Sequence, residues 1–329
     1  MVDIIMPAYN GHDTICQAVA SVAMQDNLKD IQLTIVDDLS DKPYDYILNL
    51  FPTVKIRILR KPTNTGCGPS RQYGLDRCTE RYFLFLDTDD CLFGPSVIKN
   101  MVAIMEREQL DSLWTNYVEE FEDGKRVIYR NSGTHMHGKM YRTEYIQSNN
   151  IRYNMTRLHE DHAFNAIALL VGGKNKFVDM ETYIWRSNPT SLTRKEETQK
   201  DIVGSMDAYL INSEYVITEL ARREVKVDRI ADIVKKYILS YFRFYNVMTN
   251  VGVNQEYLQS FIERIQSILE DVSEEVMELL PYERFTENFY EDDAIHAMIS
   301  HNVLISVTLD DFLNLLFDVE DENDNATHR

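Results

Sequence analysis

Residues 82–90 read Tyr82-Phe83-Leu84-Phe85-Leu86-Asp87-Thr88-Asp89-Asp90, a short apolar run followed by three carboxylates. A run of this length and composition is typical of a strand that is buried on both faces of a parallel sheet. Open α/β sheets bind their ligands just beyond the carboxyl ends of the strands. The stretch therefore predicts a central strand that ends in an acidic, ligand-facing loop.

Three more apolar runs precede this one, at residues 2–6, 33–36 and 54–59. Apolar residues at helical spacing follow the first and the fourth run, at Ile15, Val19, Val22 and Ala23 and at Val97, Met101, Ile104 and Met105. This alternation predicts an α/β fold, in which a mostly parallel sheet is flanked by helices.

The last third of the chain has a helical pattern throughout. Stripes of apolar residues at three- and four-residue spacing start at Met206, Ile230 and Leu258, which predicts a bundle of amphipathic helices. We expect an α/β domain over residues 1–200, a helical domain over residues 201–317 and an acidic, disordered tail over residues 318–329. Aromatic residues of the second stripe either pack within the bundle or form a homo-oligomer interface; they are Tyr237, Tyr241, Phe244 and Tyr245.

The composition excludes several classes of protein. Of the 329 residues, 44% are apolar, which excludes wholesale disorder. The net charge of −19 argues against a general binder of nucleic acid or anionic membranes. Neither a membrane-spanning stretch nor a secretory signal is recognisable, so a cytoplasmic location is expected. The four cysteines are too far apart for a CxxC pair and are expected to be reduced.

The acidic loop is a candidate metal site. Asp87 and Asp89 are two residues apart, so on an extended backbone their carboxylates share one face. This arrangement suits Mg²⁺ or Mn²⁺, which could bridge to a substrate diphosphate. The alternative is a polar turn that caps the next helix. A second acidic pair, Asp37 and Asp38, ends the second strand at the same edge of the sheet, so one shared pocket is predicted.

Other motifs fail to match standard sites. The loop at residues 64–71 is glycine-rich, but Arg71 stands at the third glycine position of GxGxxG and no GK[ST] follows. Nicotinamide oxidoreductases and P-loop NTPases are therefore disfavoured. The histidines of His135-x-His137 and His159-x-x-His162 suggest zinc, but the second pair lacks the spacing of HExxH, so a zinc site is also disfavoured.

Taken in order, the motifs resemble those of family 2 glycosyltransferases, which have the Rossmann-like GT-A fold. The resemblance covers residues 2 to about 195. The overall plan of the chain, a GT-A domain followed by helices, is similar to that of the soluble wall-teichoic-acid glycosyltransferases. The matching residues are Pro7-x-Tyr9-Asn10, Val36-Asp37-Asp38-x-Ser40, Asn64-x-Gly66 with Arg71-x-x-Gly74-Leu75, Leu86-Asp87-Thr88-Asp89-Asp90 and Glu160-Asp161.

The resemblance implies roles for individual residues. Positions that bind a UDP-sugar are matched by Pro7, Tyr9, Asp38, Asn64, Arg71 and Asp87. Asp87 and Asp89 match the metal motif, for Mn²⁺ or Mg²⁺. Asp161 matches the base that takes the acceptor's proton in an inverting single displacement. Arg186 and Arg194 lie in a stretch similar to the loop that closes over the diphosphate in the family.

The charge distribution bears on the acceptor. Residues 125–195 contain 12 Lys and Arg against 5 Asp and Glu, which suits an anionic polymer such as teichoic acid or DNA. The alternative is that these charges serve the donor or are scattered. We expect metal-dependent, inverting transfer from a UDP-sugar to a hydroxyl of a polymeric, anionic acceptor. Glycosylation of hydroxymethylated pyrimidines in phage DNA and a non-catalytic, sugar-nucleotide-binding assembly protein are the alternatives.

Overall fold

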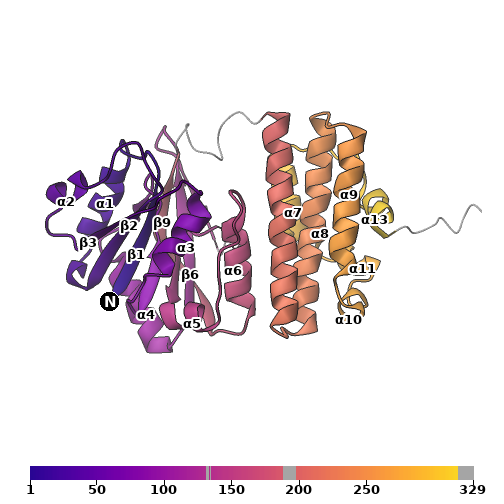
Figure 1. Ribbon diagram of the computed structural model, residues 1–329. Helices are drawn as coiled ribbons and strands as arrows, with labels where there is room; N and C mark the ends of the chain where they lie inside the picture. Colours follow the sequence, from indigo (N-terminus) through magenta and orange to yellow (C-terminus); the bar gives the residue numbers. More distant parts are fainter. Residues whose placement is uncertain (131–132, 134, 188–197, 318–329) are drawn as a thin grey trace, which may run out of the picture. The chain divides into compact units, whose positions relative to one another are not determined.

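The chain forms two compact units, Met1–Lys195 and Glu196–Arg329, in the computed structural model of the protein (Figure 1). The structure describes residues 1–130, 133, 135–187 and 198–317. Arg194 and the acidic segment at residues 318–329 lie outside the described residues.

The first unit is built on a nine-stranded sheet with the order β3-β2-β1-β4-β8-β6-β9-β5, in which β7 pairs with β6. Helices flank this sheet (Figure 1). The strands are β1 (Val2–Ala8), β2 (Ile31–Asp37), β3 (Ile56–Arg60), β4 (Tyr82–Phe85), β5 (Cys91–Leu92), β6 (Ser112–Glu120), β7 (Arg126–Tyr129), β8 (Lys139–Arg142) and β9 (Asn175–Arg186). The helices are α1 (Ile15–Ala23), η1 (Leu28–Asp30), α2 (Tyr46–Leu50), α3 (Cys67–Leu75), α4 (Val97–Glu108), α5 (Thr143–Ser148) and α6 (Glu160–Leu170).

The predicted parallel half is present. β1 pairs in parallel with β2 and β4, and β2 with β3. Every residue of β1 and β2 is buried, as continuous apolar runs covered by helices require. The helix α3 approaches β1 closely because Gly74 has no side chain: a Cβ there would lie 2.5 Å from Ile5 Cγ2. These contacts fix the strand ends that carry the acidic loops.

The rest of the sheet is mixed. β8 is antiparallel to both β4 and β6, β7 is antiparallel to β6, and β5 to β9, whereas β6 and β9 are parallel. The α/β class and the parallel core are as predicted, and the mixed half adds strands that the apolar runs did not indicate. This half brings β9 and the loop before β8 to the edge of the sheet where β4 ends.

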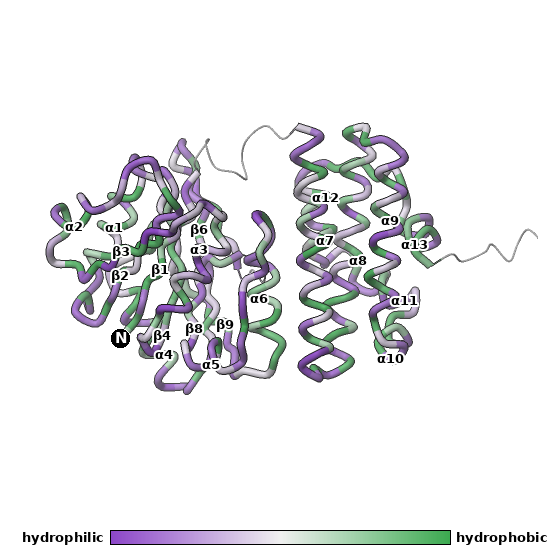
Figure 2. The backbone as a smooth tube through the Cα atoms, in the orientation of Figure 1, coloured by the Kyte–Doolittle hydropathy of each residue, from purple (hydrophilic) through white to green (hydrophobic). Residues whose placement is uncertain are grey.

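The second unit consists of helices, and Figure 2 shows hydrophobic and hydrophilic positions alternating along α7, α8 and α9. The helices are α7 (Gln199–Arg222), α8 (Val227–Asn250), α9 (Gln255–Glu270), α10 (Glu274–Met277), α11 (Tyr282–Thr286), η2 (Phe289–Glu291), α12 (Asp293–Ser300) and α13 (Leu309–Phe317). The three predicted stripes lie on α7, α8 and α9. Within the described residues, none of the helices combines the length and the apolarity needed to cross a bilayer.

The aromatic stripe of α8 is buried inside its own unit. Tyr237, Tyr241, Phe244 and Tyr245 are at most 9% exposed. Their rings contact Tyr209 of α7, Phe261 of α9 and Phe312 of α13. The stripe therefore serves packing within the bundle, and it gives no reason to expect a homo-oligomer interface.

Candidate active site

Asp38 anchors the loop that precedes α3. Its carboxylate accepts hydrogen bonds from Lys61 Nζ at 2.6 Å and from the backbone N–H groups of Thr65 and Gly66 at 3.1 and 2.7 Å. Asp38 is 3% exposed and Lys61 is 6% exposed, so each charge is compensated by the other. Gly66 has a φ of 98°, a conformation that favours glycine. Asn64 is exposed in this loop, beside the groups that Asp38 holds.

Arg71 of α3 connects two acidic parts of the site. Its Nη2 group donates to both carboxylate oxygens of Asp87, at 2.9 and 3.1 Å, and its Nη1 group donates to Glu160 Oε1 at 3.1 Å. The side chain is only 5% exposed, so the two carboxylates replace the water that a guanidinium otherwise binds. Arg71 thus joins the end of β4 to the first turn of α6.

Glu160 lies where α6 meets α3. Burial and the neighbouring Asp161 raise the pKa of Glu160 to about 7, against the opposing effect of Arg71. The first turn of α3 packs directly on this side chain, because a Cβ at Gly68 would lie 2.4 Å from Glu160 Cγ. Glu160 is therefore held between the guanidinium of Arg71 and the backbone of Gly68.

Asp90 is the buried member of the acidic loop. Its Oδ2 atom accepts a hydrogen bond from the Tyr183 hydroxyl at 2.6 Å, and its Oδ1 atom accepts the backbone N–H of Arg186 at 2.9 Å. The same Tyr183 hydroxyl accepts the backbone N–H of Asp87 at 3.2 Å. Burial, together with the charges of Asp87 and Asp89, raises the pKa of Asp90 well above its ordinary value. The end of β9 thus fixes the acidic loop.

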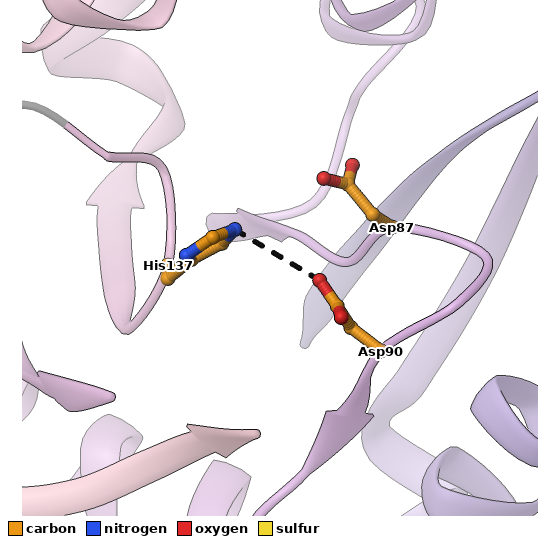
Figure 3. A group of neighbouring side chains, drawn as sticks. All are labelled: Asp87, Asp90 and His137. Carbon is orange, nitrogen blue, oxygen red and sulfur yellow. Dashed lines mark ion pairs between the residues drawn. The ribbon is translucent and has the colours of Figure 1, made fainter. Parts of the chain in front are cut away.

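His137, from the loop before β8, lies beside these carboxylates (Figure 3). The ligand atoms of Asp87, Asp90 and His137 all lie within 4.8 Å of one another, and His137 Nε2 is 3.8 Å from Asp90 Oδ2. Burial, and then the positive groups nearby, lowers the pKa of His137 well below its ordinary value, so the ring is neutral. Crowded carboxylates with one imidazole nitrogen fit a divalent cation.

The expected metal pair is only partly reproduced by this group. Asp87 belongs to it, whereas Asp89 lies half-buried in the same loop outside it. The group contains two carboxylates and one histidine, so it differs from the histidine pairs that the sequence analysis considered and disfavoured as a zinc site.

Asp161 begins α6 together with Glu160. The side chain is half-buried, and its Oδ1 atom accepts the backbone N–H of His162 at 2.8 Å. A carboxylate in the first turn is stabilised by the helix dipole. The buried Lys139 lies within its electrostatic reach: burial lowers the pKa of Lys139 to about 7, and Asp161 opposes that shift.

The His137 loop is fastened to the helix that carries Asp161. Lys139 Nζ donates to the backbone carbonyl of His135, and to that of His137 at 3.5 Å. Asn165 of α6 donates from Nδ2 to the same His135 carbonyl at 3.0 Å, and its Oδ1 atom accepts from the Tyr141 hydroxyl at 2.5 Å. One polar network thus positions His137 relative to α6.

The remaining predicted residues take different positions. Pro7 is buried in β1 opposite Val36, and Tyr9 is 55% exposed just beyond that strand. The guanidinium of Arg186 pairs with Glu120, at 3.4 Å, and with the Gln17 side chain. Arg186 therefore reaches the acidic loop through its backbone N–H, and its side chain would have to leave these partners to contact a diphosphate.

The basic segment is largely neutralised. Of the ten Lys and Arg side chains described between residues 125 and 187, six pair with carboxylates: Arg126, Arg130, Arg142, Arg152, Lys176 and Arg186. Lys139 is buried. Most of the positive side chains of this segment therefore form ion pairs within the unit.

Three contacts of the site escaped the sequence patterns. These are the Lys61 partner of Asp38, the Glu160 partner of Arg71 and the approach of His137 to Asp90. In each case the partners come from different elements, and nothing in the spacing of either motif marks the pairing. Lys61 directly follows a strand, but in the sequence it looks like an ordinary surface lysine.

The comparisons show the family to which this chain belongs. Residues 3–169 match the model of glycosyl transferase family 2. The chain therefore belongs to this family, as the motifs suggested.

Relatives match parts of the chain. EpsJ of Bacillus subtilis (strain 168), an uncharacterized glycosyltransferase, is 26% identical over 219 residues, which cover 59% of this chain and 63% of EpsJ. The Escherichia coli UDP-Glc:alpha-D-GlcNAc-diphosphoundecaprenol beta-1,3-glucosyltransferase WfaP is 34% identical over 121 residues, covering 36% of this chain and 47% of WfaP. The chain thus matches less than two thirds of the length of either relative.

Solved structures match along nearly the whole chain. Residues 1–349 of S. aureus TarS in complex with UDP align with a TM-score of 0.69 at 17% identity, covering 96% of this chain and 90% of that one. The complex of the same TarS fragment with UDP-GlcNAc has the same TM-score at 16% identity. At this identity the likeness establishes the fold, a GT-A domain followed by helices.

Proposed function

We propose that the protein transfers a sugar from a UDP-sugar to a hydroxyl group of a saccharide acceptor, with inversion at the anomeric carbon. The observation that carries the proposal is the bridge of Arg71 to Asp87 and Glu160. This bridge places the acidic loop after β4 next to the first turn of α6, where Asp161 lies. Donor-binding and proton-accepting carboxylates thereby share one edge of the sheet.

The donor assignment rests on the strand ends. The exposed ring of Tyr9 offers a face on which a base can stack, and Asp38 holds the backbone around Asn64 in place. Support comes from the TarS fragment, which has been solved with UDP and with UDP-GlcNAc. Asp87, with Asp89 or Asp90, would hold Mn²⁺ or Mg²⁺. Such a cation, when bound, neutralises the charge of the leaving diphosphate.

Asp161 acts as the base in this proposal. An acceptor hydroxyl is a weak nucleophile at neutral pH, so a carboxylate within hydrogen-bond reach takes its proton as the anomeric carbon is attacked from the face opposite UDP. Arg71 and the Asn165 network hold α6 in position, so the carboxylate is oriented before the acceptor arrives.

For the acceptor we propose a chemical class and no particular compound. A polymeric, anionic acceptor was expected from the basic segment, but most of that positive charge is paired within the unit. A saccharide acceptor is supported by WfaP, whose name gives a GlcNAc-diphosphoundecaprenol substrate. DNA gains no support from any contact of the described residues, and it is not proposed.

The test is sugar transfer and UDP binding measured on Asp161→Asn. The substitution preserves shape but cannot accept the proton, and loss of a general base costs on the order of 10²- to 10⁴-fold in rate. UDP binding should survive, because the base faces the acceptor. A panel of UDP-sugars and saccharide acceptors with Mn²⁺ identifies the active pair. Full transfer by Asp161→Asn would contradict the assignment, and loss of UDP binding would make Asp161 a structural residue.

A further inference from the structure

We infer that the half-buried rings of Trp185 and His135 form a surface on which a pyranose ring of the acceptor lies, with a hydroxyl group within reach of Asp161. The inference rests on the proposed function for its occupant, and it narrows the acceptor to a cyclic saccharide in preference to an open-chain polyol. Neither ring belongs to the motifs that carry the resemblance to the family.

The first argument is that aromatic side chains share one face of the sheet. Tyr117 of β6 lies opposite Tyr129 of β7 and opposite Tyr183 of β9. Trp185 follows Tyr183 by two residues on β9, so its side chain emerges on the same face. Tyr117 and Tyr183 are buried. Trp185 is only half-buried and Tyr129 is exposed, so part of this aromatic face is open to a ligand.

The second argument is that the loop before β8 adds two imidazole rings to this face. His137 stacks on Tyr183, with the ring centroids 4.6 Å apart. His135 Nδ1 is 3.3 Å from the Tyr117 hydroxyl. The centroid of the His135 ring is 6.1 Å from that of Trp185, and the two planes are inclined by 34°. Since His135 is also half-buried, the imidazole and the indole are neighbouring, partly exposed aromatic surfaces.

The third argument is the position of these rings beside the proposed base. Asp161 and Asn165 are four residues apart on α6 and are therefore neighbours on the helix surface. Asn165 Nδ2 donates to the backbone carbonyl of His135 at 3.0 Å. Burial lowers the pKa of His135, and the charge of Asp161 opposes that shift, so the two side chains lie within electrostatic range. A sugar on the Trp185 and His135 rings would therefore have its hydroxyl groups near the Asp161 carboxylate.

The chemistry of the surface favours a cyclic saccharide. The face of an aromatic ring carries the negative part of its quadrupole, which attracts the C–H groups on the flat side of a pyranose. An open-chain polyol has no such flat side. Carboxylates accompany the rings: Glu119 lies opposite Trp185 in the register of β6 and β9, and Asp161 lies near His135. Carboxylates accept hydrogen bonds from sugar hydroxyls and repel phosphate groups.

The first measurement is saccharide binding to the full chain with UDP present, followed by acrylamide quenching of tryptophan fluorescence. The chain has two tryptophans, and Trp114 is 4% exposed, so quenching reports chiefly on Trp185. The probes are the methyl pyranosides of glucose, galactose, mannose and N-acetylglucosamine, with sorbitol as the open-chain control. At least one pyranoside should protect Trp185 from the quencher, and sorbitol at the same concentration should not.

The second measurement is the steady-state kinetics of transfer. Trp185→Leu should raise the acceptor KM about tenfold, which corresponds to about 1.4 kcal/mol of lost binding, and should leave UDP affinity unchanged. Trp185→Phe restores a ring and should recover most of the loss. Phe93→Leu is the matched control, because it removes an exposed ring of the same unit just after β5, and its acceptor KM should equal that of the native chain. Thermal unfolding verifies that the variants are folded.

Each outcome decides the question. Protection of Trp185 by none of the pyranosides, or equal protection by sorbitol, overturns the inference. An acceptor KM that stays unchanged in Trp185→Leu also overturns it, as does a loss of UDP affinity equal to the rise in acceptor KM. The quenching result on the native chain decides the matter if Trp185→Leu does not fold. The proposed function is tested separately: protection by a pyranoside without transfer from any donor leaves the saccharide surface standing while the proposed function fails.

Discussion

At the scale of single residues, Arg71 determines the geometry of the site. It is buried, it donates to two carboxylates that lie 73 positions apart in the chain, and its neighbours Asp87 and Glu160 come from a strand end and a helix start. Removing one partner of such a buried group leaves the other charges uncompensated. A change at Arg71 should therefore affect both the stability of the fold and the geometry of the site.

We expect Arg71→Met to lower the free energy of unfolding by about 3 kcal/mol, the usual cost of breaking a buried ion pair from one side. Urea denaturation of the full chain measures it. Arg77→Met is the matched control: this exposed arginine lies just after the same helix and contacts the Tyr73 ring, and the change should cost less than about 1 kcal/mol. Equal losses in the two variants would contradict a special role for Arg71.

Glu160 gives the site a pH dependence. Its pKa is raised to about 7 in the folded chain, chiefly by burial, so between about pH 4.5 and 7 the folded state holds a proton that the unfolded state has lost. The contribution of Glu160 to the free energy of unfolding therefore falls as the pH rises through that window. Glu160→Gln, which cannot titrate, should gain stability relative to the native chain by up to about 3 kcal/mol between pH 4.5 and 8.

The measurement for Glu160 is the difference in unfolding free energy between the two proteins at several pH values. Taking the difference cancels other titrating groups, among them Asp3, whose pKa burial raises to about 6. A difference that stays constant with pH would show that Glu160 is ionised in the folded chain throughout.

Among the helices and strands, the sequence predicts those that a local pattern of apolar residues marks. The strands β1, β2 and β4 are rich in apolar residues, and their burial follows from that composition. In β9, exposed, half-buried and buried residues follow one another without a clean period, and the four residues of β8 include Lys139 and Arg142, so neither strand gave a signal. The acidic loop was recognisable, whereas its partners Tyr183 and His137 are set by the mixed half of the sheet, which only the tertiary fold defines.

The contact between α3 and α6 yields a prediction about a single methyl group. Gly68→Ala places a Cβ at 2.4 Å from Glu160 Cγ, so Glu160 must move and the Arg71 bridge must loosen. We expect transfer activity to fall at least about tenfold, as for small displacements of positioned groups, with a lower melting temperature. Gly204→Ala is the control: this exposed glycine of α7 has open space around it, and the change should stabilise the helix by about 1 kcal/mol. Unchanged transfer by Gly68→Ala would contradict the packing argument.

For the whole molecule, the placement of charge bears on which acceptor we expect the protein to favour. The chain carries a net charge of −19, and its basic segment is mostly paired with carboxylates of the same unit. The sequence count could not reveal this, because partners such as Glu108, Asp111 and Asp76 lie outside the segment. The count of charged residues alone therefore does not measure how much positive charge is left unpaired for an acceptor.

We predict a weak salt dependence of transfer to an anionic polymer. A protein that makes six or more contacts to phosphates loses on the order of 10³-fold in affinity between about 50 and 200 mM salt, because each contact releases counterions. Here most arginines of the segment already have partners, so kcat/KM should change less than about threefold over that range. The measurement compares an anionic polymer with a neutral saccharide of the same terminal unit. A steep loss confined to the anionic polymer would show that the paired arginines exchange their carboxylates for the acceptor, and the anionic acceptor would then be the better assignment.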